Sequence, residues 1–101
     1  MGTTAVAATI REQIGGKALY MLGAKNFGTN GKDLVFKIGR NSKGVTHIEI
    51  TLNSLDLYDV KFYACRGGLT PSIKTKAEHN NVYSDMLNGI IQKETELYLS
   101  L

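Results

Sequence analysis

The sequence has little cysteine and proline: one of each among 101 residues, and no tryptophan. The single cysteine, Cys65, excludes an internal disulfide and a metal site built from cysteines, and it is typical of a reducing compartment. One proline excludes a proline-rich linker. No apolar run approaches the roughly 20 residues that span a membrane, and the N-terminus shows no secretory leader. We therefore expect a cytoplasmic chain with no membrane contact.

The composition that remains is that of one small globular domain, residues 1–101. Apolar residues make up 43% of the chain and charged residues 21%, which argues against disorder. Eleven glycines outnumber the one proline, so glycine makes most of the turns. Asn30-Gly31 is the strongest of these turn signals.

Apolar spacing predicts a helix at each end of the chain. Val6, Ile10 and Ile14 recur every four residues, and Gly15-Gly16 ends this first helix. The last helix is predicted to begin at Asn80 or Asn81, with one buried stripe and with Gly89 close to the sheet. That stripe contains Val82, Met86 and Ile90.

Four strands are predicted between the helices. The short apolar run 17–22 after the double glycine is interpreted as the first strand, and alternation predicts strands over 34–38, 48–52 and 58–64. Residues 66–78 are interpreted as irregular, with a short edge segment near Ile73. The buried face should hold Ile48, Ile50, Tyr58, Val60 and Phe62, and the wetter face His47, Glu49 and Lys61. The predicted fold is α+β: a two-layer sandwich in which a four-stranded antiparallel meander is covered by an N-terminal and a C-terminal helix, in the order αββββα.

Catalytic and metal motifs are weak. Cys65 and His47 would lie on neighbouring strands, but no third group completes a nucleophilic site, and Cys65 is interpreted as a small hydrophobe. His47 with Glu49 or Asp59 lacks the ligand set of a structural metal site. Gly15-Gly16-Lys17 lacks the complete phosphate-loop pattern. We predict no enzyme, no cofactor, no metal and no catalytic residue.

Charge gives the strongest hint about partners. The net charge is +3, and the cations gather in two stretches, Arg40 to Lys43 and Arg66 to Lys76. The predicted second and fourth strands run the same way, so both stretches should leave the sheet at one end, where an acidic protein patch or a phosphate backbone would fit. The candidate partner-binding residues are Arg40, Lys43, Arg66, Lys74 and Lys76. The wet sheet face offers only Tyr63 for base stacking, which disfavours an RNA-recognition surface.

Four segments carry a likeness to known proteins: TIREQIGGKALYMLGAKNF, DLVFKIGR, VTHIEITLNSLDLYDVKF and VYSDMLNGIIQKETELYLSL. The most specific positions are Gly15-Gly16-Lys17 and residues 23–27, 56–60 and 82–87. From Thr9 to Leu101 the chain thus resembles a family of short uncharacterised proteins of bacteriophages and other mobile elements. Relatives often carry glycine in the ETEL region, where this chain has Glu96.

The resemblance implies expression inside a bacterial host and a non-enzymatic role in binding a host or phage macromolecule. The most specific version of this role is inhibition of a host defence system such as CRISPR. A small basic accessory protein that binds nucleic acid is the alternative. A third reading is a homo-oligomer that pairs through an exposed sheet edge.

Overall fold

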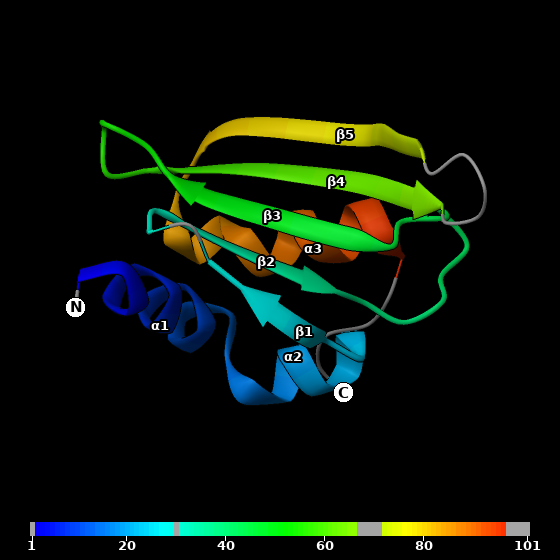
Figure 1. Cartoon of the computed structure of the whole chain (residues 1–101), viewed down its shortest axis with the longest axis horizontal. Coiled ribbons are helices and arrows are strands. Elements are labelled where there is room, and N and C mark those ends of the chain that lie inside the picture. The colour runs from blue at the N-terminus through cyan, green and yellow to red at the C-terminus, as the bar shows by residue number, and fades with distance from the viewer. Residues whose placement is uncertain (1, 30, 67–71, 97–101) are drawn as a thin grey trace.

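In the computed structural model, which describes residues 2–29, 31–66 and 72–96, an antiparallel sheet has helices on one face (Figure 1). The sheet has five strands in the order β1-β2-β3-β4-β5, so each strand pairs with its neighbour in sequence. The elements are α1 (Gly2–Ile14), α2 (Gly16–Leu22), β1 (Lys25–Gly28), β2 (Asp33–Lys37), β3 (His47–Leu52), β4 (Tyr58–Arg66), β5 (Ser72–Val82), the 3₁₀ turn η1 (Ser84–Met86) and α3 (Leu87–Thr95).

The register of the central strands is confirmed. Ile48 lies opposite Phe62, and Ile50 opposite Val60. All four are fully buried under the helices, whereas His47, Glu49 and Lys61 are half-buried on the other face. A slip of one residue would exchange the two faces, so burial of this apolar set fixes the pairing.

Helix α1 packs its predicted stripe into the core. Ile10 and Ile14 are buried, and the helix ends at Gly15, whose φ of 93° suits glycine. The Asn88 amide of α3 donates a hydrogen bond to the Ile14 carbonyl, an otherwise unpaired acceptor at the helix end (2.9 Å). The predicted first helix is therefore confirmed, and its end is tied to α3.

Residues 17–22, predicted as a strand, belong instead to helix α2. The sequence KALYML contains good helix formers and no β-branched residue. Ala18, Leu19 and Leu22 are buried, a spacing that fits one helical face, and Tyr20 is 84% exposed. Gly15 is only a break between two helices, so the double glycine does not mark a change to a strand.

Two strands were missed by the sequence prediction. β1 lies in the segment interpreted as a loop, and all four of its residues are exposed. β5 replaces the irregular stretch and the start of the predicted last helix. Its pairing with β4 shifts register twice, which interrupts alternation, and its mostly polar side chains are exposed as on an edge strand.

The last helix begins later than predicted. Asn81 is a bulge residue at the end of β5, with φ 57°, and its side-chain oxygen accepts a hydrogen bond from Asn53. In α3 the buried positions are Leu87, Ile91 and Thr95, while Met86, in the preceding 3₁₀ turn, is 49% exposed. A Cβ on Gly89 would meet nothing within 4 Å, so the expected close approach to the sheet is absent.

The α+β class therefore holds, but the predicted arrangement is wrong. The order is two helices, five strands and one helix, in place of αββββα. None of the helices in residues 2–29, 31–66 and 72–96 is long and apolar enough to cross a membrane. Asn30 of the predicted Asn30-Gly31 turn and residues 67–71 of the predicted irregular stretch lie outside the described residues.

Candidate functional site

The two basic stretches meet at one end of the sheet. β2 and β4 run in the same direction, so the connection after β2 and the start of β5 lie together (Figure 1). A Cβ placed on Gly44, in the β2–β3 connection, would lie 3.9 Å from the Nζ atom of Lys76 on β5. We call the surface formed by Arg40, Lys43, Lys74 and Lys76 the basic end. Arg66 closes β4 with its backbone opposite Ser72, but the position of its side chain lies outside the described part of the chain.

The four cations of the basic end are exposed. In the described part of the chain the ion pair within 4 Å joins His79 and Glu94, so none of the four is held by a carboxylate. Glu96, at the end of α3, contacts this region by accepting a hydrogen bond from the Ser42 hydroxyl. The basic end therefore presents positive charge to solvent.

The β2–β3 connection that carries Arg40 and Lys43 is internally braced. The Asn41 side chain donates to the Gly39 and Val45 carbonyls and accepts from the Val45 amide at 3.1 Å. The Gly39 amide bonds to Leu22 at the end of α2, and the Val45 side chain is buried. The loop is thus fixed on the scaffold, and it encloses a hollow of about 260 Å³ that Lys37 and Arg40 help to line.

The open face of the sheet, which the helices do not cover, carries a group of carboxylates. Glu49, Asp59 and Glu78 line a shallow hollow of about 170 Å³ together with Lys61. Nearer the basic end, the rings of His47 and Tyr63 are stacked with their centroids 5.4 Å apart. Burial and the neighbouring Lys37 lower the pKa of His47, and burial and Glu49 raise the pKa of Tyr63.

The two residues weighed as a Cys–His pair, Cys65 and His47, lie on the neighbouring strands β4 and β3. His47 lies opposite Tyr63, so Cys65 lies two residues further along β4. The Nδ1 atom of His47 is 2.8 Å from the Thr46 hydroxyl, which also accepts a hydrogen bond from the Cys65 amide. No three His, Cys, Asp or Glu side chains gather as metal ligands within the described ranges.

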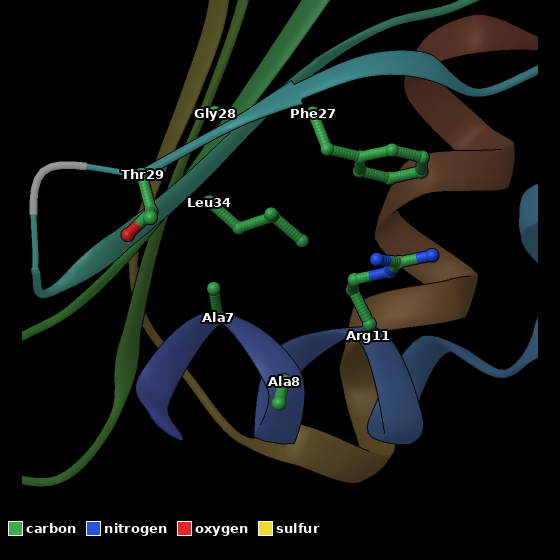
Figure 2. Close-up of a pocket in the computed structure, with 7 residues that line it drawn as sticks. All are labelled: Ala7, Ala8, Arg11, Phe27, Gly28, Thr29 and Leu34. Carbon is green, nitrogen blue, oxygen red and sulfur yellow. The ribbon is translucent and has the colours of Figure 1, made fainter. Parts of the chain in front are cut away.

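A further pocket lies between α1 and β1, which sequence reasoning missed because it placed no strand there. The pocket has a volume of about 290 Å³. Figure 2 shows Arg11 and Phe27 facing each other at one end and Thr29 at the other. The lining residues are Ala7, Ala8, Arg11, Phe27, Gly28, Thr29 and Leu34. Phe27, an aromatic residue in a segment otherwise rich in glycine and asparagine, was the available signal.

The chain was compared with known proteins at three levels. No protein-family model matches it, and neither a curated protein nor a solved structure does. The resemblance to bacteriophage proteins stays a prediction.

Proposed function

We propose that this protein acts by binding, through its basic end, a macromolecule with an acidic surface. The setting is the one that the resemblance implies, the cytoplasm of a bacterial host that carries a phage or mobile element. The proposed partner is a host or phage protein, and the sharpest form of the role is inhibition of a host defence complex such as a CRISPR effector.

The observation that carries the proposal is the convergence of unpaired cations on a braced loop and the neighbouring strand. Arg40 and Lys43 come from the β2–β3 connection, and Lys74 and Lys76 from β5. Because the Asn41 hydrogen bonds hold the loop in place, little conformational entropy is lost when a partner binds. Cations on a rigid scaffold steer an acidic partner and set its orientation.

The charge of the open face favours a protein over nucleic acid. A nucleic acid that followed the sheet would cross the hollow lined by Glu49, Asp59 and Glu78, whose carboxylates repel phosphates. One face of the Tyr63 ring is already stacked on His47, which leaves little aromatic surface for bases. On the open face these carboxylates interrupt the positive charge, so the four cations of the basic end fit a compact acidic patch better than a nucleic acid laid along the sheet.

The test begins with a pull-down from bacterial host lysate, with and without nuclease, and mass spectrometry of the captured protein. Affinity for that protein is then measured for Arg40→Glu, Lys43→Glu, Lys74→Glu and Lys76→Glu. Lys17→Glu and Lys32→Glu make the same charge change at exposed sites elsewhere and serve as matched controls. Each variant is first checked for unchanged melting.

A double variant that combines Lys43→Glu and Lys74→Glu is measured beside the single ones. We expect it to weaken binding by about tenfold or more, and the controls to have little effect. Full affinity in all four basic-end variants at physiological salt would refute the proposed surface. Capture that is lost on nuclease treatment, with an affinity that falls steeply with salt, would instead support the nucleic-acid alternative.

A further inference from the structure

The pocket between α1 and β1 combines an apolar wall with one oriented cation. The side chains of Ala7, Ala8, Phe27 and Leu34 line the wall, and the Phe27 ring also packs on Phe36 with centroids 5.5 Å apart. The Arg11 guanidinium lies 4.2 Å above the centre of the Phe27 ring. This cation–π contact holds the planar group at the mouth of the pocket, where its N–H edge can meet an anion.

The pocket has one place for a negative charge. The Thr29 hydroxyl donates a hydrogen bond to the Asp33 backbone carbonyl at 2.6 Å and accepts one from the Gly31 backbone amide. Its proton is therefore not available to bind an anion in the pocket. Arg11 has no carboxylate within 4 Å in the described part of the chain, although Glu12 is its neighbour on α1. Lys25 on β1 and Lys32 in the following turn add positive charge nearby.

The volume limits the size of the apolar part of a ligand. A dry apolar cavity of about 150 Å³ holds a benzene molecule. A pocket of about 290 Å³ therefore holds one aromatic ring and a short chain. The Phe27 ring offers this aromatic body an edge or an offset face for packing.

From this geometry we propose that the pocket binds a small aromatic monocarboxylate, with the ring against Phe27 and Leu34 and the carboxylate on Arg11. Charge complementarity selects the anion, since Arg11 is the one charged residue in the lining and has no carboxylate within 4 Å in the described part of the chain. The pocket is separate from the basic end. An experiment can therefore refute ligand binding in the pocket without refuting partner binding at the basic end, and the reverse.

The test is a titration of the whole chain with 3-phenylpropanoate, followed by amide shifts in a two-dimensional NMR spectrum. The neutral analogue 3-phenylpropan-1-ol is titrated in parallel. We expect saturable shifts confined to α1, β1 and the start of β2, a Kd of about 1 mM or tighter for the acid, and binding of the alcohol that is about tenfold weaker.

Three variants sharpen the result. Arg11→Gln should reduce affinity for the acid to that of the alcohol while leaving the alcohol unchanged. Ala8→Leu, at an exposed helical position on the rim, should fill the pocket and abolish both. Lys17→Gln removes a charge outside the pocket and should change neither.

Absence of saturable shifts up to about 10 mM, equal affinity for acid and alcohol, or an unaltered affinity in Arg11→Gln would each overturn the proposal. A peptide with a C-terminal phenylalanine that binds more tightly than 3-phenylpropanoate would overturn the assignment to a small molecule.

Discussion

Two neighbouring isoleucines of α3 test how this helix docks on the sheet. Ile91 is 0% exposed within the core, whereas Ile90 is only half-buried against it. Replacing a fully buried isoleucine with alanine costs about 2–5 kcal/mol, because apolar contacts are lost and a cavity remains. We therefore expect Ile91→Ala to destabilise the fold by about 3 kcal/mol and Ile90→Ala by about 1 kcal/mol.

The comparison is well controlled because both changes make the same substitution in the same helix, so the change in helix propensity cancels. The measurement is urea unfolding followed by circular dichroism, with thermal melts as a check. For a domain of this size, 3 kcal/mol corresponds to a melting temperature lower by roughly 12–24 °C. Equal losses in the two variants, or a larger loss in Ile90→Ala, would refute the docking of α3 described above.

Two further predictions concern glycine and histidine. Gly89→Ala should stabilise the fold by about 0.5–1 kcal/mol, because the site is helical and a Cβ there meets nothing. Gly23→Ala should destabilise it by about 1–2 kcal/mol, because Gly23 has φ 68° and its Cβ would lie 3.3 Å from the Gly39 nitrogen. Urea unfolding that gives the two variants free-energy changes of the same sign would contradict this prediction. Burial and Lys37 lower the pKa of His47 from 6.5, so the unfolded chain takes up the proton first and stability should fall as the pH drops below about 6.5. His47→Gln should flatten that decrease in unfolding free energy between about pH 7.5 and 5.5, and an unchanged slope would exclude His47 as its source.

The sequence predicted the elements whose own residues carry a strong pattern. In β3 and β4 apolar and polar side chains alternate without interruption, and in α1 the spacing of Ile10 and Ile14 matches one helical face. Such patterns reflect burial directly, so they located these elements and their faces correctly.

The elements that were missed depend on tertiary contacts more than on local pattern. β5 forms because β4 supplies its hydrogen-bond partners. Its two register shifts interrupt the alternation of apolar and polar side chains that predicts a strand. In the sequence, Asn81 is typical of a helix N-cap. In the structure its backbone N–H donates a hydrogen bond to the Asp59 carboxylate and stabilises a bulge. The short α2 was ambiguous because an apolar run of six residues fits either a strand or a helix.

The two candidate sites also differ in how much of each could be predicted from the sequence. Strand direction alone placed Arg40 and Arg66 at one end of the sheet, since it depends only on the parity of the meander. The position of Lys76 beside Gly44 depends on β5, which the sequence did not predict. The Asn41 hydrogen bonds to Gly39 and Val45 depend on the folded shape of the β2–β3 connection, which no periodic pattern indicates. The Arg11–Phe27 pocket required β1, which lacks any alternating pattern.

The most direct test of the binding surface is site-specific photo-crosslinking to the captured partner. A photoreactive amino acid is placed at Ser42 and Thr75, next to the cations of the basic end, and at Leu55 in the β3–β4 turn and Asp85 in η1, which lie at the opposite end of the sheet; all four positions are exposed. The proposed function predicts covalent crosslinks to the partner from Ser42 and Thr75 and none from Leu55 or Asp85. Crosslinks from Leu55 or Asp85, with none from the basic end, would contradict it.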